Sequence, residues 1–135
     1  MTVDGTTTEQ MQAGRRFAEA LADKRADDLE RLLAPDIDFR GLTPGRAWEA
    51  TGTAQVLEIL LGHWFAPADV IEELVEVDTS TFADRQHVRY QLAGHDAEGP
   101  FVVEQQAYYM TDGDPESGRI TWMRVLCSGF RTPAA

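Results

Sequence analysis

The stretch FVVEQQAYYM, residues 101–110, is apolar at both ends and carries three polar side chains in its middle, Glu104, Gln105 and Gln106. Successive side chains of a strand point to opposite faces, so Gln105 must face one way and its two neighbours the other. An inward Glu104 could act as a general acid or base. An inward Gln105 could only donate and accept hydrogen bonds. The chemistry of this stretch therefore depends on which face is buried.

The pattern of the last predicted strand, residues 119–130, indicates which face that is. We place Tyr109 opposite Thr121, which makes one face apolar except for Gln105 and the tyrosine hydroxyl. We expect Gln105 on the buried face and Glu104 outside, in a homodimer interface, because aromatic residues with arginine are typical of interfaces. A solvated sheet face with ordinary cross-strand pairs is the alternative. The buried face carries Val103, Gln105, Ala107, Tyr109, Met123, Val125 and Cys127, and the interface carries Glu104, Gln106, Tyr108, Trp122, Arg124 and Leu126.

Tyr90, His63 and Cys127 are further side chains with reactive groups that we expect near the interior. Tyr90 is most simply a wall residue with one hydroxyl to satisfy. Cys127 is most simply a small buried hydrophobe. His63 lacks a carboxylate at a readable spacing, so it is most simply a helix-end residue bonded to backbone or water. A buried Gln105 without partners would cost about 1–3 kcal/mol, so Tyr90, a water or a ligand must bind it.

No motif in the sequence indicates a metal or a cofactor. His87 and His95 are eight residues apart and lack a matching set of ligands. The acidic turn DGDPESG, residues 112–118, lacks the spacing and the closing glutamate of a calcium loop. No glycine-rich phosphate loop precedes a helix. We therefore expect no metal and no cofactor.

Composition limits the class of protein. The 135 residues have the size of one domain and are 43% hydrophobic, so we expect a single domain over residues 1–135. The net charge of −11 argues against nucleic-acid partners and anionic membrane surfaces, which require basic footprints. One cysteine, no apolar run that could span a bilayer and no signal-peptide pattern favour the cytoplasm. Lys24 is the only lysine among 12 basic residues, a skew that suggests a GC-rich bacterial genome.

A set of helices followed by a set of strands must position these side chains. Helical spacing predicts a helix over residues 6–21, and a second helix with Leu29, Leu32 and Leu33 on one face that ends before Pro35. Thr53 caps a third helix, whose inward stripe is Val56, Ile59, Leu60 and His63. Strands are expected at residues 36–42, around Trp48, and at 70–81, 85–94, 101–111 and 119–130. Helices before hairpins indicate the α+β class.

This order of elements resembles the nuclear transport factor 2-like superfamily, and within it the SnoaL-like group of polyketide cyclase, ketosteroid isomerase and limonene epoxide hydrolase relatives. The resemblance is carried by FAEALADKRADDLERLLAPDIDFRG, by WEATG before a helix, and by AYYMTDGDPESGRITWMRVLCSGF. It covers roughly residues 10–131. It implies a cone-shaped, curved antiparallel or mixed sheet with three N-terminal helices packed on its concave face. It also implies a pocket between helices and sheet, and often a dimer on the convex face.

The resemblance also identifies where the catalytic residues of relatives would fall. The tyrosine and the two aspartates of the isomerases fall on Phe17, Gly41 and Ala107. The final-strand aspartate of the epoxide hydrolases falls on Val125, their tyrosine and asparagine on Phe39 and Gly41, and their Arg-x-Asp near Val88 and Tyr90. The polyketide cyclases likewise use a final-strand aspartate. With no inward carboxylate, the chain should not be a ketosteroid isomerase.

Two functions remain open. The first is a binding protein whose apolar cavity holds a small hydrophobic or aromatic molecule. The second is a cofactor-independent isomerase, cyclase or hydrolase with a non-standard residue set, in which Tyr90 or His63 donates a proton and Gln105 is an electrophilic hydrogen-bond donor. A third possibility is a cavity filled by its own side chains, with Trp48, Trp64 and Met123 as stoppers. The expected lining is Phe17, Phe39, Trp48, Ile59, His63, Tyr90, Gln105, Tyr109, Met123, Val125 and Cys127.

Overall fold

The computed structural model describes the backbone of residues 3–113 and 118–134, and the side chains of residues 12–113 and 118–134. Its helices are α1 (Val3–Ala22), α2 (Ala26–Leu32) and α3 (Thr53–Leu57), and α3 continues directly into a π-helix, η1 (Glu58–Trp64). Its strands are β1 (Leu33–Thr43), β2 (Arg46–Thr51), β3 (Val70–Phe82), β4 (Arg85–Asp96), β5 (Gly99–Thr111) and β6 (Ile120–Cys127). The predicted turn at 112–118 lies largely outside the described residues.

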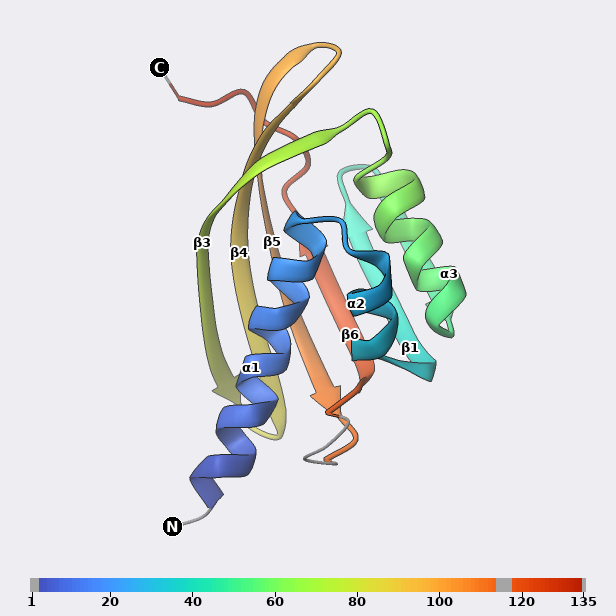
Figure 1. Cartoon of the computed structure of the whole chain (residues 1–135), viewed down its shortest axis with the longest axis vertical. Coiled ribbons are helices and arrows are strands. Elements are labelled where there is room, and N and C mark those ends of the chain that lie inside the picture. The colour runs from blue at the N-terminus through green and yellow to red at the C-terminus, as the bar shows by residue number, and fades with distance from the viewer. Residues whose placement is uncertain (1–2, 114–117, 135) are drawn as a thin grey trace.

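The six strands form one curved, unclosed sheet in the order β2-β1-β6-β5-β4-β3. β1 and β6 are parallel and all other neighbours are antiparallel, so the sheet is mixed. Figure 1 shows the helices on one side of this sheet, with α1 across β3 to β5 and α3 beside β1. The predicted α+β class and the cone-like arrangement are confirmed. Among the described residues, none of the helices combines the length and apolarity that crossing a bilayer requires.

Small residues let α1 lie close to the sheet. Ala13, Gly14, Phe17 and Ala18 are buried on its inner side. A Cβ atom on Gly14 would lie 2.6 Å from the Tyr109 hydroxyl oxygen and 2.9 Å from Val88 Cβ, so only glycine fits. The Gly14 N–H donates to that hydroxyl over 2.9 Å, which fixes the helix against β5.

The second helix ends earlier than its apolar spacing predicts. Leu33, expected on the helix, has extended backbone angles and begins β1. Leu29, Leu32 and Leu33 are nevertheless all buried. Pro35 disfavours helical geometry in the residue before it, and the chain becomes extended one residue sooner still. Both segments therefore contribute to one core although the predicted boundary was wrong.

The predicted register of the last hairpin was wrong by two residues. Tyr109 pairs with Met123, and Gln105 pairs with Cys127. An irregularity between Met110 and Thr111 interrupts the ladder, which the predicted pairing assumed to be continuous. Because side chains alternate with a period of two, a two-residue error leaves every side chain on its predicted face.

Lys24, in the turn between α1 and α2, connects this turn to the segment between η1 and β3. Its Nζ donates to the carbonyl of Ala66 over 2.7 Å and also to the carbonyl of Asp69. Burial lowers the pKa of this amine, and the Asp69 charge opposes that shift. The segment between η1 and β3 is thereby held against the end of α1.

Candidate ligand site on the concave face

Tyr90, Gln105 and Cys127 form one row across three neighbouring strands. Gln105 on β5 pairs with Tyr90 on β4 and with Cys127 on β6. All three side chains are on the concave face and are buried, Gln105 with only 1% of its surface exposed. Among the side chains that the structure describes, Gln105 is the only buried one with an amide or a charge.

The amide of Gln105 is satisfied on one side only. The Tyr90 hydroxyl donates to its Oε1 over 2.6 Å, as one of the sequence alternatives expected. Burial, with a smaller contribution from Cys127, raises the pKa of Tyr90 well above its usual value, so the phenol stays neutral and remains a donor. The Nε2 of Gln105 is buried, and no group of the described residues accepts a hydrogen bond from it. Buried polar groups are nearly always paired, so this donor requires an explanation.

Trp64, the last residue of η1, contributes a second unpartnered donor. Its side chain is buried, and within the described part of the chain its Nε1 has no hydrogen-bond partner. Its ring packs 5.8 Å from that of Phe39 and meets that of Trp48 edge-on at 6.1 Å. The partly buried Trp48 is different, because its Nε1 donates to Thr43 Oγ1 over 2.8 Å. The sequence identified Trp64 only as a side chain that could fill the interior.

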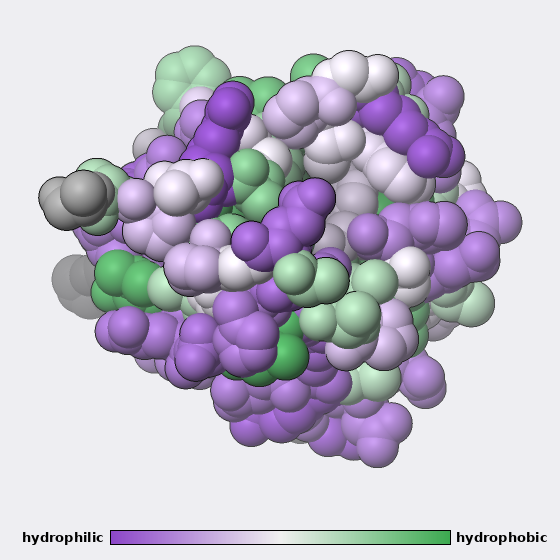
Figure 2. All heavy atoms as spheres, turned by 90° about the horizontal axis from the view of Figure 1, so that it is seen from above, coloured by the Kyte–Doolittle hydropathy of each residue, from purple (hydrophilic) through white to green (hydrophobic). Residues whose placement is uncertain are grey.

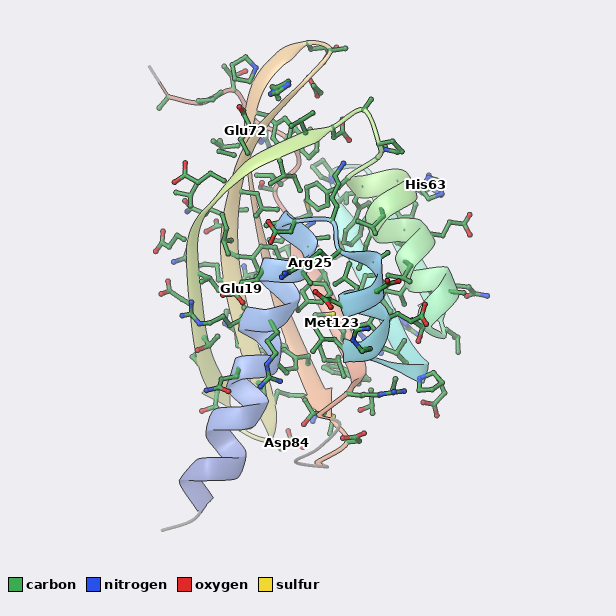
Figure 3. The ribbon with its side chains drawn as sticks, viewed as in Figure 1. Glu19, Arg25, His63, Glu72, Asp84 and Met123 are labelled. Atoms are coloured by element: carbon green, nitrogen blue, oxygen red, sulfur yellow. The ribbon has the colours of Figure 1, made fainter. Side chains whose placement is uncertain are left out.

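His63 is exposed near the end of η1 and is not among the buried members of the predicted lining. Its side chain is 46% exposed (Figure 3), with Nε2 3.9 Å from a Glu58 carboxylate oxygen, and its ring packs against that of Trp48 on β2 with centroids 5.3 Å apart. The cause of this exposure is the π-helix, in which Phe65 N–H bonds to Leu60 O, five residues back. The wider turn delays the return to the inner face by one residue, so Trp64 takes the inward place that α-helical spacing assigns to His63.

The other predicted lining residues lie where the alternation places them. Trp48 is partly buried at the edge of the sheet. Met123 lies between α1 and α2 in the view of Figure 3. The hydroxyl of Tyr109 meets α1, and burial raises its pKa to about 12 although the Gly14 N–H lowers it. The buried members are Phe17, Phe39, Ile59, Tyr90, Gln105, Tyr109, Met123, Val125 and Cys127.

Apolar groups occupy the positions to which the sequence resemblance assigned a catalytic tyrosine or aspartate. Phe17 at the tyrosine position, and Ala107 and Val125 at aspartate positions, are all buried. At Gly41 there is no room for a side chain, because a Cβ there would lie 2.5 Å from Cη2 of Trp64. The described interior therefore offers hydrogen-bond donors but no carboxylate that could serve as a general base.

Side chains of the described interior make close contacts with one another. None of five hollows at the surface of the described chain is lined by Phe17, Tyr90, Gln105 or Tyr109, whereas Trp48 and Val125 border the one on the outer face. Phe17 and Tyr90 instead lie with ring centroids 6.3 Å apart. Figure 2 shows hydrophilic side chains over much of the end seen from above, with small hydrophobic patches between them. A ligand would therefore have to displace side chains to enter.

Glu104 lies on the outer face, as the alternation predicts. It receives a hydrogen bond from Arg89 over 2.6 Å, and Arg89 also pairs with Glu76 at 2.9 Å and with Asp78. The Arg89 guanidinium lowers the pKa of Glu104 below its usual value, against a smaller effect of burial. Glu104 is therefore an ion-pair partner on the outer surface.

The remaining outer residues mix apolar and charged groups. Trp122 lies between Arg85 and Arg124, whose guanidinium carbons are 4.5 and 4.4 Å from its ring centroid. Leu126 is 51% exposed beside an outer hollow of about 690 Å³. The interface set of Glu104, Gln106, Tyr108, Trp122, Arg124 and Leu126 thus shares this face.

His87 and His95, whose spacing the sequence analysis tested for a metal site, both have other partners. His87 Nε2 lies 3.0 Å from Gln106 Oε1, and His95 Nδ1 lies 3.2 Å from Glu72 Oε1. Within the described part of the chain, no three histidine, cysteine, aspartate or glutamate side chains gather as a metal site would require.

Comparison with solved structures places the fold in a class. Similar structures include a Bacillus subtilis protein described as a candidate isomerase, at a TM-score of 0.74 and 16% identity over 91% of this chain and 88% of that one. An LEH-like epoxide hydrolase of M. tuberculosis has a TM-score of 0.65 at 16% identity, over 90% and 84%. A candidate SnoaL-like polyketide cyclase of Shewanella denitrificans has 0.62 at 15%, over 88% and 90%.

The chain therefore has the nuclear transport factor 2-like fold of the SnoaL-like proteins, as its sequence resemblance predicts. No family model and no curated sequence matches it. Likeness at this level of identity shows the fold and leaves the reaction to be argued from the site.

Proposed function

We propose that this protein binds a small, neutral, mostly apolar molecule on its concave face, and that a hydrogen-bond acceptor on that molecule meets the Nε2 amide of Gln105. The observation that carries the proposal is the buried, unpartnered Nε2 of Gln105 among aromatic side chains. An unsatisfied buried donor costs about 1–3 kcal/mol, which a carbonyl or ether oxygen on a ligand would offset.

The charge of the ligand follows from the groups around it. The described interior holds no charged side chain, so an ion there would lack a counter-charge and would lose its hydration. The donors of Gln105 and Trp64 have no partner among the described residues, whereas Gln105 Oε1 already accepts from Tyr90. A neutral molecule with acceptors and few donors therefore fits best.

An enzyme with a non-standard residue set is the alternative. Its proton donor would be Tyr90, whose hydroxyl already donates to Gln105. His63 is a weaker candidate because its side chain is 46% exposed to solvent. Without an interior base, proton abstraction has no acceptor group, and this favours binding over catalysis.

We further propose a homodimer through the outer sheet face. The support is the group of exposed apolar side chains there, Leu42 at 53%, Leu126 at 51% and Tyr108 at 40% exposure, around the outer hollow. Exposed apolar groups gathered in this way mark interaction surfaces more often than scattered ones do. A bacterial, cytoplasmic setting is likewise our proposal from the arginine skew and the single cysteine.

The binding proposal is tested with two molecules of nearly the same shape, cyclohexanone and methylenecyclohexane, of which only the ketone has an acceptor. By titration calorimetry, the wild type should prefer the ketone by about 1–3 kcal/mol, or roughly five- to 150-fold. Gln105→Leu should remove this preference while circular dichroism shows an intact fold. If wild type and variant treat the two molecules alike, Gln105 is only a packing residue and the proposal is wrong.

A further inference from the structure

Gly41 on β1 has no backbone reason to be glycine. Its φ angle is not in the positive region where glycine is favoured, in contrast to Gly45, Gly52 and Gly129. A glycine inside a strand weakens it, and often marks the close approach of another group. Here the approaching group is Trp64, whose Cη2 and Cζ2 would lie 2.5 and 2.7 Å from a Cβ at position 41. The missing side chain of Gly41 therefore leaves the space that the Trp64 indole occupies, and we call this position the seat of the indole.

The seat adjoins the row that contains Gln105. Gly41 pairs with Val125, and Val125 pairs with Ala107, so three small or medium residues form the next row on the concave face. Two residues along a strand correspond to about 7 Å. A molecule that occupied the place of the indole would thus lie over Gly41 and Val125, within one row of the free amide of Gln105.

The indole is packed there without any polar bond to hold it. Its Nε1 has no hydrogen-bond partner in the buried position, whereas a ring turned outward would give this N–H to water. Trp64 is also the last residue of the π-helix, and π-helical turns occur often at functional sites. Its neighbour Trp48 is anchored by Thr43 and is partly exposed, so the two tryptophans differ in what holds them.

We propose that Trp64 is the specificity-determining residue of the interior, a displaceable plug seated on Gly41 that a ligand must push aside to reach Gln105. The size of ligand that the protein accepts is then set by how far this indole moves. This inference rests on the proposed binding function, and its test separates the two.

The first measurement follows the plug itself. In the W48F/W122F protein, Trp64 is the only tryptophan, because the chain has three. Saturating this protein with cyclohexanone should shift its emission to the red and raise acrylamide quenching of Trp64 at least twofold. G41A, whose Cβ would meet the ring, should produce the same change without ligand.

The second measurement tests how the size of the side chain at position 64 limits the size of the ligand. W64A should bind the larger ketone 2-adamantanone at least tenfold more tightly than the wild type does, with W64F between them. L61A is the matched control, because it shortens a partly buried side chain of the same helix and leaves the plug in place. If W64A does not fold by circular dichroism, the W64F comparison decides.

The outcomes separate the two proposals. If cyclohexanone binds while Trp64 quenching stays constant, and the Trp64 variants gain no affinity for 2-adamantanone, the plug is wrong and the binding function stands. If neither the wild type nor the Trp64 variants bind either ketone, the binding function fails and the plug fails with it.

Discussion

The hydrogen bond from Tyr90 to Gln105 joins two side chains that water does not reach. Each side chain therefore depends on the other, because neither has bulk solvent as a substitute partner. One polar group of the pair, the Nε2 of Gln105, has no hydrogen-bond partner among the described residues. At this scale the protein combines a satisfied hydrogen bond with an unsatisfied donor in a single side chain.

A double-mutant cycle on this pair should show strong coupling. Y90F leaves Oε1 of Gln105 without its hydrogen-bond donor and should lower the free energy of unfolding by about 1–3 kcal/mol. Q105L leaves the Tyr90 hydroxyl without its acceptor but removes the unpartnered amide. The free energy of unfolding should therefore fall by less than in Y90F. In Y90F/Q105L both polar groups are gone, and the loss should be less than the sum of the single losses. Urea unfolding measures all three variants.

Additivity within about 0.5 kcal/mol would contradict this account. In that case the Tyr90 hydroxyl and the Gln105 amide would not depend on each other for stability. The cycle needs no ligand, so it tests the geometry of the site independently of the proposed function.

At the scale of elements, the contact of α1 with the sheet depends on Gly14. An alanine in a helix is normally about 0.5–1 kcal/mol more favourable than glycine. G14A should nevertheless destabilise by about 1–3 kcal/mol, because its Cβ would lie 2.6 Å from the Tyr109 oxygen and 2.9 Å from Val88 Cβ.

Gly62 supplies the matched control for G14A. Among the described residues, and apart from the backbone of its own helix and its chain neighbours, the only atom within 4 Å of its would-be Cβ is Glu58 Cγ at 3.8 Å, so G62A should be neutral or stabilising by up to about 1 kcal/mol. Urea unfolding of both variants measures the difference. Equal stability of G14A and G62A would show that α1 does not approach the sheet as closely as described.

The elements also show what the sequence could predict. The inner and outer faces of β5 and β6 follow from alternation alone, so Gln105 and Glu104 were placed correctly despite the wrong register. The register depends on the irregularity at Met110, which no local pattern of apolar residues encodes. The π-helix is likewise invisible to a spacing rule based on α-helical turns, which is why His63 was predicted where Trp64 lies.

The residue types that line the site could be predicted from the sequence, but whether the interior is open or filled could not. The absence of an inward carboxylate, and Gln105 as the buried amide, follow from residue types and alternation. Whether the interior is open depends on three-dimensional packing between Trp64 and Gly41, which are 23 residues apart in the sequence and on different elements. The glycine was visible in the sequence, but the reason for it was not.

At the scale of the whole molecule, the homodimer that we propose is tested on the outer face of the sheet. A stable interface buries about 1,200–2,000 Å² in total, and it would have to cover the exposed side chains of Leu42 and Leu126. L126D should place a charge in the centre of that face and convert the protein to a monomer in sedimentation velocity at micromolar concentration. V75D, on the edge strand β3, is the control and should leave the dimer intact.

A wild type that sediments only as a monomer at micromolar concentration would overturn the dimer. The apolar outer side chains would then belong to an ordinary solvated face with cross-strand pairs, which was the alternative from the sequence. The Arg89 cluster with Glu76, Asp78 and Glu104 would be consistent with either outcome, because it is satisfied within one chain.

The position of Lys24 has a practical consequence for chemical labelling. It is the only lysine in the chain, so acylating reagents encounter a single side-chain amine, and that amine is bonded to the carbonyls of Ala66 and Asp69. A dye attached there would sit at the segment that follows Trp64. Lys24 is thus the one lysine side chain that can be labelled, and its rate of modification reports how often the segment between η1 and β3 leaves the end of α1.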